Sequence, residues 1–250
     1  MLHSEHVRLH GQDLVFPLVN KTVAVGDGMY GGRDAYYLEV GANALELIHS
    51  ALSAAERTAK DITRILDYAC GFGRVLRWLR AGFPQAHIVA ADADPNAIRA
   101  VREIFNVDTI VLDRSLTENL GGEFDLIWMG SLATHLPEAQ LKPLLARLRS
   151  LLSTRGILVF TTHGPFVVKR IATGEKLYGL DPQGLALILA DYQRTGYGFS
   201  PYPKQASYGI SVCTAAKLLS LVEDSGLQPI LYHERGWVKH QDCVAAIRAL

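Results

Sequence analysis

The sequence of 250 residues is poor in cysteine and carries no excess of either charge. Its three cysteines, Cys70, Cys213 and Cys243, lie far apart and form no CxxC pair, which argues against a disulfide framework and against a cysteine-based metal site. The 25 basic and 25 acidic residues cancel, so the chain lacks the positive excess that nucleic-acid binding normally requires. We therefore expect no nucleic-acid partner.

Long apolar runs are also missing. No uninterrupted apolar stretch approaches the roughly 20 residues of a membrane-spanning helix. Residues Met1–His10 mix charged and polar side chains without an apolar segment, unlike a secretory signal. These absences predict a cytoplasmic protein with no membrane partner, and the length fits one large α/β domain.

The sequence does contain a regular alternation of short apolar runs and segments with helical periodicity. Apolar strands that alternate with amphipathic helices predict a parallel sheet covered by helices on both faces. Asp94 and Pro95 are typical of the start of a helix. The strands are expected at Ile62–Asp67, His87–Asp92, Thr109–Leu112, Phe124–Met129 and Ile157–Thr162, and the helices at Arg74–Gly82, Pro95–Phe105 and Pro137–Leu152.

The predicted sheet domain covers residues 61–250 and follows an N-terminal helical and loop cap at residues 1–60. Residues 164–207 interrupt the alternation, and we expect them to form a partly helical insertion over the carboxyl edge of the sheet, on its acceptor side. The remaining elements are expected to be a strand at Asp13–Val19, a helix at Ala35–Ala59, a helix at Thr214–Ser225, and antiparallel strands at Pro229–Glu234 and Asp242–Arg248.

A glycine turn joins the first strand of the alternation to its first helix, in the stretch ILDYACGFGRVLRWL. The turn contains Gly71 and Gly73, and Asp67 ends the strand before it. Ligands of doubly wound sheets bind beyond the carboxyl ends of the strands, so this turn is expected to lie against a ligand. Two ligands compete for the assignment, a nicotinamide dinucleotide and S-adenosylmethionine.

The residues around the turn favour S-adenosylmethionine. The dinucleotide fingerprint GxGxxG needs a small residue at its third position, where this chain has Leu76. The carboxylate of Asp67 would repel a pyrophosphate, whereas it attracts an ammonium or a sulfonium. The start of the following helix, together with Arg74, is suited to a ligand carboxylate. Asp92 ends the second strand and can accept hydrogen bonds from the ribose hydroxyls of either cofactor.

Four segments of the sequence resemble the successive motifs of the class I S-adenosylmethionine-dependent methyltransferases. They are LDYACGFG, VAADADPNAI, FDLIWMGSLATHLP and LLSTRGILVFTTHG. The segments YYLEVGANAL and GWVKHQD further resemble a bacterial subgroup of unassigned substrate. The resemblance implies S-adenosylmethionine as cofactor. It also implies a doubly wound, mostly parallel sheet of seven strands in the order 3-2-1-4-5-7-6, with helices on both faces.

The resemblance also implies roles for individual residues. Asp92 matches the ribose-binding acid, Ala93 the position beside the adenine, and Asp113 lies near the usual adenine-contacting acid. Together with Arg74, whose charge suits the ligand carboxylate, the residues expected to bind the cofactor are Asp67, Gly71, Gly73, Arg74, Asp92, Ala93, Asp113, Gly130 and Ser131.

Methyl transfer to an oxygen benefits from a base that takes up the acceptor's proton. His135 follows the fourth strand and His163 the fifth, and an antiparallel closing hairpin returns His240 and Asp242 to the same edge. We predict His163 as the base, because an imidazole with its ordinary pKa of about 6.5 can accept a proton at neutral pH. The other three residues are further catalytic candidates. Nothing in their spacing fixes a metal site, and no metal is predicted.

Tyrosines gather in two segments, one before the first long helix and one near the end of the insertion. Aromatic rings can cover a sulfonium or line an apolar acceptor pocket. From these segments, Tyr30, Tyr37 and Tyr208 are predicted to line the pocket of the methyl acceptor.

The sequence therefore predicts an S-adenosylmethionine-dependent methyltransferase whose acceptor is a small molecule or a sugar-like compound, with a hydroxyl as the methylated group. Two alternatives stay open. One is a catalytically silent S-adenosylmethionine-binding module that acts through protein partners. The other is a nicotinamide-dependent oxidoreductase.

Overall fold

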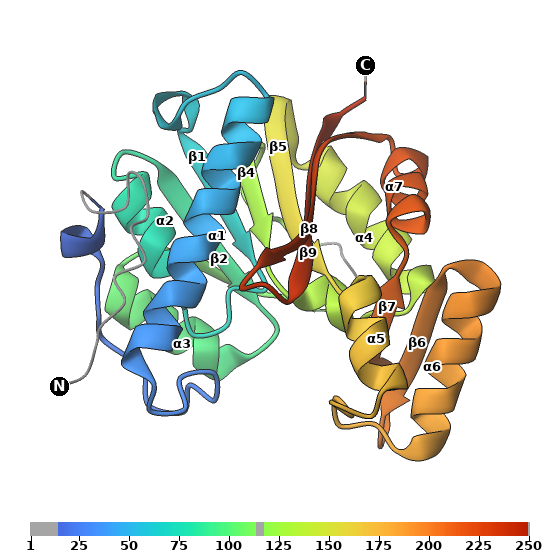
Figure 1. Ribbon diagram of the computed structural model, residues 1–250. Coiled ribbons are helices and arrows are strands. Elements are labelled where there is room, and N and C mark those ends of the chain that lie inside the picture. Colours follow the sequence, from blue (N-terminus) through green and yellow to red (C-terminus); the bar gives the residue numbers. More distant parts are fainter. Residues whose placement is uncertain (1–14, 114–117, 250) are drawn as a thin grey trace, which may run out of the picture.

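A computed structural model describes residues 15–113 and 118–249 of the protein. These residues form a seven-stranded sheet in the order β3-β2-β1-β4-β5-β9-β8 and a separate two-stranded sheet of β6 and β7 (Figure 1). The strands are β1 (Arg64–Tyr68), β2 (His87–Asp92), β3 (Asp108–Val111), β4 (Phe124–Met129), β5 (Leu152–Thr162), β6 (Tyr197–Tyr202), β7 (Gln205–Cys213), β8 (Leu227–Trp237) and β9 (Gln241–Arg248). The α-helices are α1 (Asp34–Ala54), α2 (Leu76–Gly82), α3 (Pro95–Phe105), α4 (Glu138–Ser150), α5 (Pro165–Ala172), α6 (Pro182–Thr195) and α7 (Ala215–Asp224).

The large sheet is parallel from β3 to β5, and β9 runs antiparallel to both of its neighbours. In chain order β8 and β9 are the sixth and seventh strands of this sheet, so the predicted order 3-2-1-4-5-7-6 is confirmed. The doubly wound α/β fold class is confirmed with it.

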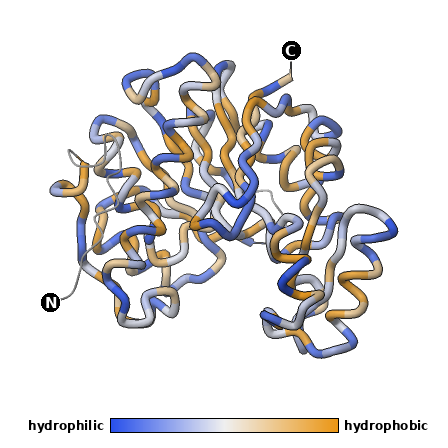
Figure 2. The backbone as a smooth tube through the Cα atoms, in the orientation of Figure 1, coloured by the Kyte–Doolittle hydropathy of each residue, from blue (hydrophilic) through white to orange (hydrophobic). Residues whose placement is uncertain are grey.

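Helices bury both faces of the sheet. Successive strand residues point to opposite faces, so Ile65 packs in the core beneath α1, α2 and α3, whereas Leu66 packs in the core beneath α4 and α7. Figure 2 shows the strands as largely hydrophobic segments in the middle of the molecule. Continuous apolar strands of this kind need cover on two sides, which explains why the sequence pattern reads as a parallel sheet.

The start of α3 follows from two residues that the sequence singles out. The Asp94 side chain accepts a hydrogen bond from the Asn96 N–H, and Pro95 occupies the first helical position. Asn106 ends the helix in the left-handed conformation, with φ of 50°. The turn before this helix lies at the carboxyl end of β2, where the functional site is found.

The N-terminal elements differ from the prediction. Residues 13 and 14 of the predicted strand lie outside the described residues, as do Met1–His10, and Phe16–Leu18 forms a 3₁₀ turn instead of a strand. Pro17 has no N–H to donate to a strand ladder, which is a physical reason for the difference. The predicted helix at Ala35–Ala59 ends early, at Ala54, and Glu56 just beyond it has a left-handed φ of 52°.

The predicted insertion at 164–207 contains α5, α6, β6 and the first residues of β7. Residues 196–209 are rich in glycine, proline and tyrosine. They form most of the antiparallel β6–β7 hairpin, which continues to Cys213. This segment has a small core of its own, and it stands beside the large sheet as a separate lobe (Figure 1). By contrast, α1 of the predicted N-terminal cap packs into the main core.

Candidate functional site

A cavity of about 850 Å³ lies at the carboxyl ends of the parallel strands. Asp67 of β1 and Asp92 of β2 line it, together with Tyr208 of β7 and Trp237 of β8. Its volume falls in the range of small-molecule sites. The cavity therefore lies where the sequence predicts the ligand.

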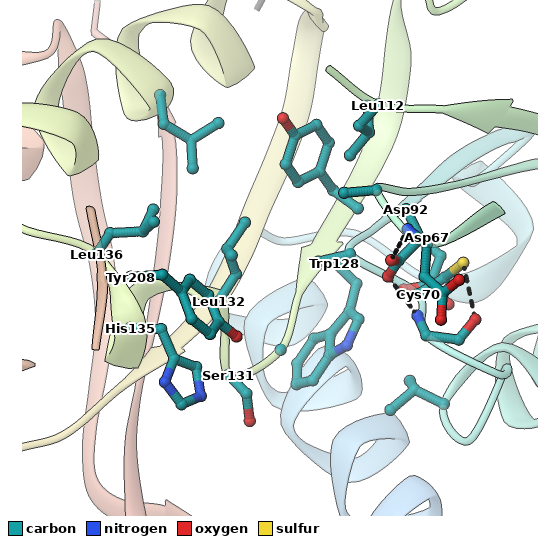
Figure 3. Close-up of a pocket in the computed structure, with 18 of the residues that line it drawn as sticks. Asp67, Cys70, Asp92, Leu112, Trp128, Ser131, Leu132, His135, Leu136 and Tyr208 are labelled. Atoms are coloured by element: carbon teal, nitrogen blue, oxygen red, sulfur yellow. Dashed lines mark hydrogen bonds between the residues drawn. The ribbon is translucent and has the colours of Figure 1, made fainter. Parts of the chain in front are cut away.

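The cavity has two chemically different sides. In the view of Figure 3, Asp67 and Asp92 lie on one side of Trp128, and His135 and Tyr208 lie on the other. We name these the carboxylate side and the aromatic side. All five residues line the cavity.

Asp67 is buried and lacks a partner on the carboxylate side. Its side chain lies at the end of β1, and its Oδ2 atom has no hydrogen-bond partner among the described residues. Burial, and then the carboxylate of Asp92, raise the pKa of Asp67 to about 8. A buried carboxylate without a partner is costly, and a cationic ligand group would relieve that cost. The donor set therefore fits an ammonium and does not fit a pyrophosphate.

The two glycines of the turn have different surroundings, although both have positive φ, 52° at Gly71 and 83° at Gly73. Gly71 lines the cavity, and a Cβ added there would meet no atom within 4 Å. Gly73 is not among the residues that line the cavity, and a Cβ there would lie 2.5 Å from Cε2 of Phe105. Gly71 thus borders the ligand space, whereas Gly73 lets Phe105 pack against the turn.

Asp92 links the glycine turn to the next helix. Its Oδ2 accepts a hydrogen bond from the Gly71 N–H at 2.7 Å, and its Oδ1 accepts one from the Asp94 N–H at 2.9 Å. Each carboxylate oxygen keeps a further lone pair for a ligand hydroxyl. The predicted cofactor residues Ala93, Asp113, Gly130 and Ser131 also line the cavity.

Arg74 supplies a positive charge to the same cavity. Its guanidinium lies 5.8 Å from the ring centroid of Trp237, and it takes part in none of the ion pairs formed among the described residues. Burial lowers the pKa of Arg74, but an arginine stays charged at neutral pH. Because an ammonium favours the charged form of Asp67, a ligand with both an ammonium and a carboxylate finds a complementary charge for each group in Asp67 and Arg74. That is the charge pattern of the amino-acid end of S-adenosylmethionine.

His135 is the predicted catalytic residue that the structure places in the cavity, on its aromatic side. Its Nδ1 lies 2.7 Å from the carbonyl oxygen of Gly209. Because a carbonyl only accepts, Nδ1 carries the hydrogen, and Nε2 of the neutral ring is left with its lone pair. Burial lowers the pKa of His135, so the ring is neutral at pH 7.

The other three predicted catalytic residues gather in a cluster that is not part of the cavity lining. The ring centroids of His163 and His240 are 5.5 Å apart. Asp242 pairs with the end of β5, and its carboxylate accepts hydrogen bonds from the Tyr232 hydroxyl at 2.6 Å and from the Arg235 N–H at 2.9 Å. Asp242 therefore has partners within the fold.

The predicted base His163 is enclosed in this cluster. Its side chain is only 4% exposed, and its Nδ1 donates a hydrogen bond to the Ser211 carbonyl at 3.2 Å. Burial, and then His240 and His135, lower the pKa of His163 to about 3. A base must reach the proton that it removes, so the geometry favours His135 over His163. Across the part of the chain that the structure describes, no three His, Cys, Asp or Glu side chains are placed to hold a metal ion.

Only one of the three predicted acceptor-pocket tyrosines lines the cavity, and that is Tyr208. Tyr37 is buried, and its hydroxyl donates to Asp27 Oδ2 at 2.5 Å. The Tyr30 hydroxyl donates to Asp34. The Tyr37 hydroxyl thus holds Asp27, which lines the cavity, whereas neither Tyr37 nor Tyr30 lines it.

Several cavity residues escaped the sequence analysis. Trp128 lies in the apolar run of β4 and is buried, yet it also borders the cavity. Trp237 comes from the closing hairpin, where its Nε1 donates to the Val40 carbonyl at 2.9 Å. Trp237 lies in the GWVKHQD turn, and the predicted return of that turn to this edge of the sheet was the indication in the sequence that Trp237 could lie near the ligand. Leu132 and Leu136 follow β4 without any motif that marks them.

Comparisons with known proteins identify the domain. Residues 65–156 match the family described as "Methyltransferase domain". The chain is 32% identical over 130 residues to the malonyl-[acyl-carrier protein] O-methyltransferase of Bacillus anthracis, a match of 51% of this chain and 48% of the relative. It is 36% identical over 84 residues to the release factor glutamine methyltransferase of Deinococcus radiodurans, a match of 32% of this chain and 30% of the relative. The chain thus spans less than half the length of these curated relatives.

Solved structures share the fold. A sugar N-methyltransferase from a Streptoalloteichus species aligns over 100% of both chains with a TM-score of 0.61 and 15% identity. Human N-acetylserotonin methyltransferase, solved in complex with SAM, aligns over 85% of this chain and 54% of that chain, with a TM-score of 0.55 and 14% identity. Residues 65–156 thus match a methyltransferase domain, and the fold is the one found in solved S-adenosylmethionine-dependent methyltransferases.

Proposed function

We propose that the protein transfers the methyl group of S-adenosylmethionine to a hydroxyl of a small-molecule acceptor. The observation that carries the proposal is the division of one cavity into a side with two carboxylates and a side with a neutral histidine. The first side suits a cationic cofactor. The second offers a base to an acceptor hydroxyl.

The carboxylate side would hold the cofactor through groups of complementary charge. Asp67 would bind the ammonium, Arg74 the carboxylate, and Asp92 the ribose hydroxyls. Ala93 and Asp113 line the part of the cavity proposed for the adenine. When bound, S-adenosylmethionine supplies an electrophilic methyl group on a sulfonium.

His135 would act as the base. Its hydrogen bond to Gly209 fixes the tautomer, so Nε2 is the atom that takes up the acceptor's proton. The hydroxyl oxygen would gain the methyl group as the methyl–sulfur bond breaks, leaving S-adenosylhomocysteine, and would lose its proton to the imidazole. A positioned base of this kind contributes about 10²–10⁴ in rate.

The insertion at 164–207 would cover the acceptor side. This role is supported by its position in the chain, directly after β5, and by the neighbouring residues Ser207 and Tyr208, which line the cavity. Covering loops exclude water from the reacting groups. The division into a cap at 1–60 and a domain at 61–250 stays a prediction.

A small-molecule acceptor is supported by the solved structures that share this fold, which include the mitomycin 7-O-methyltransferase and a sugar N-methyltransferase.

We further propose that the protein works in the cytoplasm with neither a nucleic-acid nor a membrane partner. Its free, buried cysteines are compatible with a reducing compartment. No helix in the described ranges is both long and apolar enough to cross a bilayer.

Two measurements test the proposed function. Calorimetry above the pKa of Asp67, which is about 8, should show binding of S-adenosylhomocysteine and none of NAD⁺, because the charged Asp67 carboxylate repels a pyrophosphate. With labelled S-adenosylmethionine, label should then appear in a hydroxylated metabolite. Tight binding of NAD⁺ alone would overturn the assignment. Binding of S-adenosylhomocysteine without label transfer to any acceptor would instead favour the silent binding module.

A further inference from the structure

The aromatic side of the cavity is built around a stack of rings. The rings of His135 and Tyr208 lie nearly parallel, with centroids 4.8 Å apart and an interplanar angle of 22°. Tyr202 joins them, with its ring centroid 6.0 Å from each of the other two. The stack therefore combines one residue that follows β4 with two residues of the β6–β7 hairpin.

The hairpin fixes this stack through the backbone. Gly209 offers its carbonyl to His135, and it also packs so closely on the facing strand that a Cβ would lie 2.0 Å from the Ser200 carbonyl oxygen. Ser211, two residues further along β7, donates its hydroxyl to the Ala133 carbonyl at 2.8 Å. Two hydrogen bonds thus tie β7 to the segment that carries His135, so the rings are held in place before a ligand arrives.

Much of the rest of this side is apolar. Leu132 and Leu136 line the cavity, and Figure 3 shows both beside Tyr208. Among its polar lining residues, Gln140 is exposed at the rim, and the Ser131 hydroxyl accepts a hydrogen bond from the Gln241 side chain at 2.9 Å. The Nε2 atom of His135 therefore joins the hydroxyls of Ser207 and Tyr208 as one of the few polar groups on this side of the cavity.

This lining discriminates between two kinds of acceptor. A sugar would bring several hydroxyls into the apolar space, and each hydroxyl left without a partner lowers affinity by a factor of about ten or more. A planar aromatic ring with one hydroxyl loses little hydration and gains contacts with aromatic and aliphatic side chains. We propose that the acceptor is a planar, aromatic hydroxyl compound, held against the Tyr208–His135 stack with its hydroxyl at Nε2 of His135. This inference rests on the proposed function, since it names the acceptor class of the same site.

Binding of simple probes tests the inference without a known substrate. The probe is 2-naphthol, titrated by its fluorescence into the protein saturated with S-adenosylhomocysteine. Its matched controls are decahydro-2-naphthol, which is not planar, naphthalene, which has no hydroxyl, and methyl glucoside. We expect 2-naphthol to bind at least about tenfold more tightly than each control.

Variants of the stack complete the test. Tyr208→Leu should weaken 2-naphthol binding by about tenfold or more, whereas Tyr208→Phe, which keeps the ring, should stay within about threefold of the parent. His135→Phe should abolish the preference for 2-naphthol over naphthalene. Calorimetry with S-adenosylhomocysteine serves as the folding control for each variant.

The outcomes separate this inference from the proposed function. If S-adenosylhomocysteine binds but methyl glucoside binds as well as 2-naphthol, or Tyr208→Leu leaves 2-naphthol binding unchanged, the aromatic acceptor is refuted and the methyltransferase proposal stands. If the parent protein does not bind S-adenosylhomocysteine, the proposed function fails, and the acceptor inference fails with it.

Discussion

Gly73 of the glycine turn packs against Phe105, the last residue of α3. A Cβ at Gly73 would lie 2.5 Å from the Phe105 ring. The second glycine of the turn is thus a packing residue of the main core, in which Phe105 is buried. The first glycine, Gly71, faces the cavity. This difference between two neighbouring glycines leads to a paired prediction.

Gly73→Ala should lower the free energy of unfolding by about 3 kcal/mol, because it combines a left-handed backbone with an overpacked contact. Gly71→Ala is the matched control: it has the same backbone penalty of roughly 1–2 kcal/mol but no clash. Urea unfolding measures both. A second substitution, Phe105→Leu, should restore part of the loss in Gly73→Ala. Equal losses for the two glycine variants would contradict the assigned roles.

Asp67 should make stability depend on pH in the cofactor-free protein. Its pKa of about 8 lies above the ordinary value of 3.8 for an aspartate, so the folded protein holds an extra proton between these pH values. The contribution of this group to stability therefore falls as pH rises from about 4 to about 8. Asp67→Asn, which has the same shape and no charge, should gain stability relative to the parent over that interval. Urea unfolding at about pH 5 and about pH 9 checks the sign. Parallel profiles of parent and variant would refute the prediction.

The two charges proposed for the amino-acid end of the cofactor can be tested with a pair of ligands. Arg74→Met and Asp67→Asn should each weaken S-adenosylhomocysteine binding by about tenfold or more. Neither should change the binding of methylthioadenosine, which lacks the amino-acid portion, by more than about threefold. Calorimetry provides all the affinities. Equal losses for both ligands would mean that the variants damage the fold of the site.

Asp92→Ala should behave differently from those two variants, because both ligands carry the ribose. We expect affinity for S-adenosylhomocysteine and for methylthioadenosine to fall by about tenfold or more, since a hydrogen bond to a charged group contributes about 1.5–3 kcal/mol. Asp108→Ala, at an exposed carboxylate of β3, is the control. An unchanged dissociation constant in a folded Asp92→Ala protein would remove Asp92 from the site.

Much of the sheet could be predicted from the sequence because burial on both faces leaves a simple pattern. The bounds of β2 and β4 agree with the prediction, and the strand order follows from the resemblance. The β6–β7 hairpin was missed as a pair of strands. Its glycines and prolines indicate loops, whereas Gly209 is required by close packing against Ser200 within the hairpin. Local composition cannot distinguish a glycine that belongs to a loop from a glycine that allows two strands to pack closely.

The site could be predicted only where ligand chemistry is tied to the end of a strand. Asp67, Gly71 and Asp92 follow from their position in the turn, and all three line the cavity. His163 and His135 both follow strands at the same edge, so the sequence offers no means of choosing between them. The choice depends on the β6–β7 hairpin, because Ser211 covers His163 while Gly209 orients His135 at the cavity.

The hydrogen bond between Trp237 and Val40 joins residues that are 197 positions apart in the sequence. One wall of the cavity therefore depends on the closing hairpin, which is synthesised after all the other strands that the structure describes. A nascent chain released before this hairpin holds Asp67 and Asp92 but lacks Trp237 against α1. Cofactor capture should accordingly occur only after β8 and β9 have joined the sheet, and the cofactor then stabilises the finished fold and not a partial one.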